Sequence, residues 1–217
     1  VEEKPTGEIS AGAGVATAGA TVGVSVAENN FLGRGIQFGS DITLSENNLK
    51  GLVSVINPNF QGTNRSLNFS LESSSNDRLS DFGYKSNKTG FSIGTGFEFY
   101  DDLRFNTGVS SYVENLKTDS SASKKMKQQK GSYFDTFFNY TLDYDKRDSR
   151  YQTTDGFRSR FTQNIPLVSE NYSLTNTYDY KYFQKWLNEN VATFGVYASS
   201  TSALNGGDVK LSERIHL

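Results

Sequence analysis

The chain of 217 residues has a formal net charge of −2, so it lacks the excess of Lys and Arg that is typical of nucleic-acid-binding proteins. It contains no Cys, which excludes disulfides, zinc thiolate sites and cysteine nucleophiles. No run of residues approaches the roughly 18 consecutive apolar side chains that a membrane-spanning helix requires.

The main pattern in the chain is an alternation of apolar and polar residues. Between Phe91 and Phe99, odd-numbered positions hold Phe, Ile or Thr, and even-numbered positions hold Ser, Gly or Glu. A period of two residues indicates β-strands with one apolar and one polar face. Many such strands, with a polar face rich in Gly, predict a membrane β-barrel whose outside contacts lipid and whose inside contacts water.

Eleven strands are expected. In chain order they are Glu8–Thr17, Thr21–Ala27, Gly35–Leu44, Lys50–Ile56, Arg65–Ser74, Thr89–Phe99, Leu103–Asn115, Ser132–Asp145, Phe157–Ile165, Asn171–Phe183 and Asn190–Ser200. The rows expected to face lipid are Val22/Val24/Val26, Ile36/Phe38/Ile42/Leu44, Leu67/Phe69/Leu71, Phe105/Val109/Val113, Phe134/Phe138/Tyr140/Leu142 and Phe157/Phe161/Ile165.

The connections between these strands predict an orientation. One end is expected to hold short turns, at residues 29–30, 57–59, 100–102 and 184–188, and the other long polar loops, at Ser75–Lys85, Lys117–Gly131 and Thr201–Glu213. Short periplasmic turns and long external loops are typical of outer-membrane barrels. Aromatic residues gather near the short turns, as in the girdles at membrane interfaces; they are Phe99, Tyr100, Tyr140, Tyr144, Tyr178, Tyr180, Tyr182 and Trp186.

The fold class that follows is all-β: an incomplete antiparallel transmembrane barrel. An odd number of strands does not close in the even-stranded bacterial manner, so we expect this chain to be part of a longer barrel. The alternative is a soluble β-sandwich with aromatic residues in its core. The polar face disfavours it, because Gly, Ser, Asn and charged residues do not pack well against a second sheet.

Five short segments stand out at the ends and turns of these strands. They are residues 1–8, the turn with Asn30, Phe31, Gly33 and Gly35, the turn with Asn57 and Pro58, the turn with Arg147, Asp148, Asp155 and Gly156, and residues 212–217 with Glu213 and Arg214. In this order they resemble the BamA family of outer-membrane β-barrel assembly proteins. Thr153 stands where that family often has Pro, which we expect to loosen the turn.

The resemblance implies a domain organisation and a function. Residues 1–7 would be the end of a junction with a periplasmic POTRA domain, and residues 8–217 the N-terminal part of a sixteen-stranded barrel. Glu213 and Arg214 would begin a loop that folds into the lumen. The implied function is to fold and insert other barrels at a lateral seam between the first and last strands. The implied partners are nascent barrel proteins, accessory lipoproteins bound through POTRA domains, and the lipid and lipopolysaccharide of the bacterial outer membrane.

The first strand supports a weak seam without reference to any family. Its residues Ile9, Ser10, Ala11, Gly12, Ala13, Gly14 and Val15 are mostly small. Glycine in a strand costs entropy and offers no cross-strand packing, so the pairing of this strand is easily broken. Its free N–H and C=O groups would then template an incoming client strand. The alternative is that these small residues only line a crowded lumen.

Other signals carry less weight. Neither Gly-x-Gly pair, at 12–14 and 94–96, completes a phosphate-binding pattern. His216 has no partner, and the acidic residues between 143 and 155 favour turn ion pairs over a Ca²⁺ loop. The Lys-rich segment 124–130 suits either a solvated loop or the binding of lipopolysaccharide phosphates.

We expect no enzymatic activity and no cofactor. The alternative functions are a two-partner secretion pore and a passive porin-type channel. A porin-type channel would carry a ladder of charges in its lumen, whereas the inner strand faces here show only scattered charges such as Asp41, Glu72 and Glu98.

Overall fold

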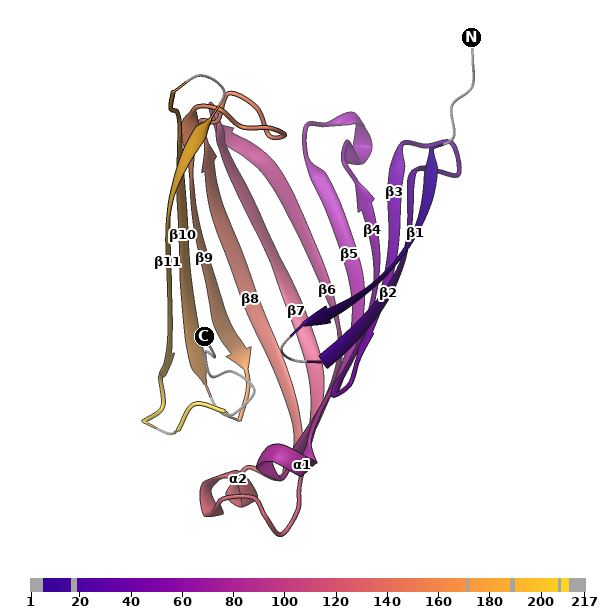
Figure 1. The fold of residues 1–217 in the computed structure, drawn as a ribbon, viewed down its shortest axis with the longest axis vertical. Coiled ribbons are helices and arrows are strands. Elements are labelled where there is room, and N and C mark those ends of the chain that lie inside the picture. The colour runs from indigo at the N-terminus through magenta and orange to yellow at the C-terminus, as the bar shows by residue number, and fades with distance from the viewer. Residues whose placement is uncertain (1–5, 17–18, 171, 188–189, 207, 211–217) are drawn as a thin grey trace.

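The computed structural model describes residues 6–16, 19–170, 172–187, 190–206 and 208–210. It contains one antiparallel sheet of eleven strands in sequence order, curved into an open trough (Figure 1). The strands are β1 (Gly7–Ala16), β2 (Gly19–Phe31), β3 (Ile36–Ser45), β4 (Asn48–Asn57), β5 (Ser66–Arg78), β6 (Tyr84–Tyr100), β7 (Leu103–Thr118), β8 (Gly131–Asp145), β9 (Gly156–Val168), β10 (Ser173–Lys185) and β11 (Val191–Ala203). The predicted fold class and number of strands are confirmed.

The sheet has two ends, which we name by their connections. The turn end holds the connections that follow β2, β4, β6, β8 and β10, with the short helix η1 (Phe60–Gly62). The helical end holds the connections that follow β1, β3, β5, β7 and β9, with α1 (Leu79–Phe82) and α2 (Lys124–Gln128). In Figure 1 the turn end is at the top and the helical end at the bottom.

No helix among the described residues has the length and apolar character needed to cross a membrane.

Alternation of exposure along the strands separates an outer face from an inner face. In β7 and β8, Val113 and Phe134 are exposed on the outer face, whereas Glu114, Tyr133 and Asp135 on the inner face are buried. The register pairs Val113 with Phe134 and Glu114 with Tyr133, so the two faces continue from strand to strand. The outer face therefore presents apolar side chains such as Val113 and Phe134, as expected for contact with lipid.

One row within the apolar part of the outer face is polar. It runs across six strands and comprises the directly paired residues Thr95, Thr107, Tyr140, Gln163, Asn176 and Ser200. The Tyr140 hydroxyl donates to Gln163 Oε1 at 3.1 Å, and Gln163 Nε2 donates to Asn176 Oδ1 at 2.5 Å. Apolar rows lie on both sides of it; they are Ile93–Val109–Phe138–Ile165 and Phe97–Phe105–Leu142–Phe161. Tyr140, which was expected near the rim, thus lies inside β8.

Two expectations about the connections are wrong. The predicted loop Ser75–Lys85 is mostly strand, because β5 continues to Arg78 and β6 begins at Tyr84. These segments lack an apolar alternation, yet their backbones pair and Lys85 Nζ lies 2.7 Å from Asp77 Oδ2. At the turn end, residues 146–155 form a connection nearly as long as residues 119–130 at the helical end. The turns of that end are therefore not uniformly short.

Candidate functional site

The strand β1 forms one free edge of the sheet. It pairs with β2 and with no other strand among the described residues, and β11 forms the opposite edge. All seven residues predicted to template a client, from Ile9 to Val15, lie in β1 and are exposed. The register pairs Ala11 with Val24, so Ala11 lies on the outer face, and it pairs Gly12 with Gly23 on the inner face.

The glycines of β1 lie in open space. A Cβ added at Gly12 or Gly14 would meet nothing within 4 Å. No close contact within the described sheet therefore requires glycine at these two positions. Their effect is to leave the edge of the strand without side chains.

The turn between β2 and β3 is closed by the side chain of Asn30. Its Oδ1 accepts a hydrogen bond of 2.7 Å from the Gly35 backbone N–H. Gly33 and Gly35 have φ angles of 68° and 65°, a left-handed conformation that favours glycine. Phe31 stacks on Phe38 with ring centroids 5.4 Å apart. The sequence motif thus corresponds to a hydrogen-bonded turn, although Asn30 and Phe31 are the last residues of β2 rather than turn residues.

The turn between β4 and β5 has a similar side-chain closure. Asn57 is the last residue of β4, and its Oδ1 accepts from the Asn59 N–H at 3.2 Å. Pro58 separates these two residues, and its fixed φ angle suits the start of a turn. The turn ends where Arg65 lies over the ring of Phe97, 5.6 Å from its centroid.

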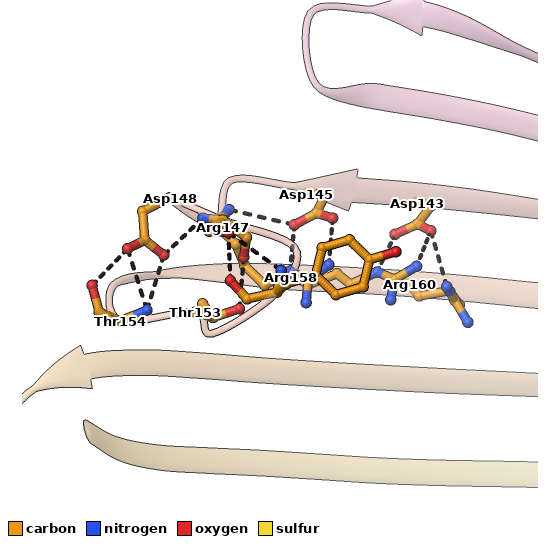
Figure 2. Close-up of polar contacts among 10 residues, drawn as sticks. Asp143, Asp145, Arg147, Asp148, Thr153, Thr154, Arg158 and Arg160 are labelled. Atoms are coloured by element: carbon orange, nitrogen blue, oxygen red, sulfur yellow. Dashed lines mark hydrogen bonds and ion pairs between the residues drawn. The ribbon is translucent and has the colours of Figure 1, made fainter. Parts of the chain in front are cut away.

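The turn between β8 and β9 is held by charged and hydroxyl side chains (Figure 2). Arg147 binds the Asp145 carboxylate through two nitrogens, at 2.7 and 2.8 Å. Asp148 accepts from the Thr154 hydroxyl at 2.6 Å and from the Thr154 N–H at 3.0 Å. The pKa of the Asp148 carboxyl is lowered to about 2, chiefly because the Thr154 hydroxyl donates to it.

Thr153, which was expected to loosen this turn, adds a hydrogen bond to it. Its hydroxyl donates to the Ser149 carbonyl oxygen at 2.7 Å, a bond that proline would not make. Gly156 begins β9 with a φ angle of 98° and lies directly against the Lys146 carbonyl, so a side chain would not fit there. Asp155 contributes through its backbone oxygen, which accepts from the Asp148 N–H at 3.1 Å.

In the parts of β8 and β9 next to this turn, charged side chains gather on the inner face. The Asp143 carboxylate accepts from Arg158 at 2.8 and 2.6 Å and from Arg160 at 3.1 Å (Figure 2). A cavity of about 600 Å³ opens beside them; its lining residues are Glu98, Asp102, Arg104, Asp143, Asp145, Arg147, Asp148, Ser149, Arg150 and Arg158. The inner face therefore carries more charge near the turn end than the scattered residues the sequence indicated.

A buried ion pair at the helical end was not predicted. Lys210 Nζ lies 2.6 Å from Asp135 Oδ2, and the two side chains are 4% and 5% exposed. The Ser169 hydroxyl donates to the same carboxylate at 2.5 Å, and Lys210 lies 4.4 Å from the centroid of the Tyr133 ring. Lys210 follows β11, whereas Asp135 belongs to β8, so the chain returns across two strands to the inner wall.

Two of the predicted site residues, Glu213 and Arg214, lie outside the described residues, as do residues 1–5 of the predicted junction. Within the described ranges, no group of three or more His, Cys, Asp and Glu side chains is arranged to hold a metal ion.

Comparison with known proteins agrees with this architecture. The model of the Omp85 superfamily domain matches residues 30–217. The structure is similar to that of BamA from Haemophilus ducreyi lacking POTRA domains 1–3, with a TM-score of 0.80 and 18% sequence identity. The match covers 96% of this chain and 43% of that one, so the chain spans less than half the length of that relative. The fold is that of part of an outer-membrane β-barrel, and the chain belongs to the Omp85 superfamily.

Proposed function

We propose that this chain is the N-terminal part of the barrel of an outer-membrane assembly factor. It inserts client β-barrel proteins by pairing their strands with the free edge of β1. The observation that carries the proposal is the composition of β1: between Ile9 and Val15 the strand holds only Ser, Ala and Gly, so it offers few side chains that could select one partner strand. Unpaired strand edges are costly in lipid and accept another strand readily.

The composition of β1 suits a partner that changes with each client. Main-chain hydrogen bonds give affinity to any strand, whereas large side chains would select among strands. Gly12 and Gly14 leave the inner side of the edge bare, and Ala11 and Ala13 leave the outer side thin. A thin apolar belt beside the edge perturbs the adjacent bilayer and lowers the barrier to insertion. No covalent chemistry and no cofactor take part.

The turn end faces the periplasm in this proposal, and the helical end faces the cell exterior. POTRA domains attached before β1 would recruit accessory lipoproteins, and nascent barrel proteins would be the substrates. The turns that contain Asn30 and Asp148 give this end of the barrel a rigid rim, because hydrogen bonds from their own side chains close each turn. The source would be a Gram-negative bacterium, and nucleic acid is not a partner.

Site-specific photocrosslinking in growing cells tests the proposal. A photoreactive residue is placed at each position from Ile9 to Val15 of the intact protein that carries this chain. We expect adducts to the terminal strand of newly made barrel proteins. The matched control is a scan of Phe38–Leu44 in β3, a strand that is paired on both sides and should give no client adducts.

The alternatives give different results. Adducts from β1 only to the protein's own last strand would mean a closed barrel and would contradict the proposal. A secretion pore would instead crosslink an unfolded polypeptide from inner-face positions near Arg158. A second experiment replaces Ala11 and Ala13 by Leu, which thickens the outer belt. Client insertion should then slow, and unchanged insertion would exclude the bilayer contribution.

A further inference from the structure

Beyond the apolar band, the outer face of β6, β7 and β8 changes character in three successive rows. Thr89, Val113 and Phe134 form the first row and are exposed. The second row consists of Asn87, Asn115 and Ser132, which are paired side by side in the register. Successive outer-face rows lie about 7 Å apart along a strand. The outer face therefore passes from apolar to amide and hydroxyl groups within one step.

The third row is cationic. Lys85 and Lys117 are directly paired across β6 and β7 on the outer face. Lys130 immediately precedes Gly131, the first residue of β8 and the partner of Leu116, so extending the register by one residue would bring it opposite Lys117. Lys85 and Lys117 thus lie side by side at the helical end, one step beyond the amide row, and Lys130 immediately precedes the neighbouring strand β8.

This arrangement is unfavourable without an anion. Like charges directly opposite each other in a sheet destabilise it. Asp77 compensates Lys85, with Lys85 Nζ 2.7 Å from Asp77 Oδ2. Lys117 and Lys130 are exposed, and their ammonium groups have no ion pair with another residue in the described part of the chain. Two positive charges at the edge of the membrane band are therefore left for an external anion.

We propose that these rows form a binding site for a phosphorylated glycolipid of the outer leaflet. Acyl chains lie along Val113 and Phe134, sugar hydroxyl and amide groups bond to Asn87, Asn115 and Ser132, and a sugar phosphate binds Lys117 and Lys130. The order of the rows matches the order of acyl chain, sugar and phosphate in such a lipid. The binding requires only that the helical end face the outer leaflet, and it involves no client.

Lipid retention measured by native mass spectrometry tests the site. The intact protein is reconstituted into phosphatidylcholine nanodiscs that contain a small fraction of diphosphoryl lipid A, and bound lipids are counted after release. We expect the Lys117→Gln, Lys130→Gln double variant to retain roughly 10-fold less lipid A than the wild type. The Lys117→Arg, Lys130→Arg variant keeps the charges and should retain as much as the wild type, which also controls for folding.

A matched control lies in the same loop. Lys124 and Lys127 in α2 are exposed lysines outside the three rows, and replacing both by Gln should leave retention unchanged. Equal losses in the two Gln double variants would overturn the site in favour of diffuse attraction. Unchanged retention in the Lys117/Lys130 variant would also overturn it.

The lipid chemistry is tested with three further probes. Lipid A without phosphates should be lost from the wild type, and phosphatidylglycerol should bind less than diphosphoryl lipid A. Equal retention of either probe would overturn the glycolipid assignment. Millimolar inorganic phosphate should not displace the bound lipid, since displacement would mean a simple phosphate site. Because none of these readouts uses a client, failure here is distinct from failure of the insertion proposal.

Discussion

The ring of Tyr112 covers the backbone of Gly90, its directly paired neighbour on β6. Lys88 Nζ lies 4.1 Å from the centroid of the same ring, so glycine, ring and ammonium form a stack on the inner face. The stack exists because residue 90 has no side chain: a Cβ would overlap both the Tyr112 ring and the Ser111 carbonyl oxygen.

Replacing Gly90 by Ala should therefore lower the free energy of unfolding by about 1–3 kcal/mol, since the ring and a backbone carbonyl must both shift. Urea unfolding of the intact protein in detergent micelles measures the loss. Gly12→Ala is the control, because a Cβ there meets nothing within 4 Å, and it should change stability by less than about 1 kcal/mol. Similar losses at both positions would mean that the Tyr112 contact contributes little.

The buried pair between Lys210 and Asp135 predicts a large loss. Lys210→Met leaves the Asp135 carboxylate buried without its counter-ion, which typically costs about 3–5 kcal/mol. The same unfolding measurement applies. The exposed pair Lys125–Asp208, with 3.6 Å between Nζ and Oδ2, is the control, and Asp208→Asn should cost less than about 1 kcal/mol. A small loss for Lys210→Met would show that the segment after β11 does not stay against β8.

The turn at Asp148 should respond to acid. Its pKa is lowered from 3.8 to about 2 by the Thr154 hydroxyl, so the ionised form stabilises the folded turn above about pH 3.8. That contribution is lost as the pH falls from 3.8 towards 2. We expect the wild type to be more stable than Asp148→Asn at pH 6, and the difference in denaturation midpoint to close near pH 2.

Asp155→Asn serves as the control for the acid response, because Asp155 takes part in this turn through its backbone oxygen. Its denaturation midpoint should follow that of the wild type over the same range. A gap between wild type and Asp148→Asn that is equal at pH 6 and pH 2 would contradict the role of the ionised carboxylate.

The turn after β2 depends on one side chain and on left-handed glycines. Asn30→Ala removes the 2.7 Å bond to the Gly35 N–H and should cost about 1 kcal/mol. Gly35→Ala should cost about 1–2 kcal/mol, because its φ angle of 65° is unfavourable for a residue with a Cβ. Both losses are measured by urea unfolding, and Gly14→Ala, without a positive φ angle, provides the comparison. An unchanged midpoint for Asn30→Ala would mean that water replaces this bond.

Much of the fold could be predicted from the sequence because lipid imposes a period of two. Rows such as Val22/Val24/Val26 must face one side of a strand, which fixes both its existence and its faces. Where a strand extends past the lipid, its residues need not alternate between apolar and polar. The polar residues from Ser75 to Arg78 pair through their backbones without any apolar alternation, so they were predicted as loop.

The candidate site could be predicted only where its chemistry is local. Asn30 and Gly35 lie five residues apart, and their turn motif is visible in the chain. Asp135 and Lys210 lie 75 residues apart, and their pairing depends on how the chain returns to the inner wall. No spacing or composition signals that contact. Thr153 was interpreted through its difference from proline, whereas its hydroxyl acts as a hydrogen-bond donor.

The polar row through Tyr140, Gln163 and Asn176 fixes the register of the strands that it crosses. A slip of β9 by one residue would turn Gln163 to the inner face and break both of its side-chain hydrogen bonds. In hydrocarbon no water replaces them, so a misregistered sheet would leave unpaired amides facing lipid. An apolar residue at position 163 would tolerate such a slip. The row therefore selects a single alignment of β8, β9 and β10 while the sheet assembles.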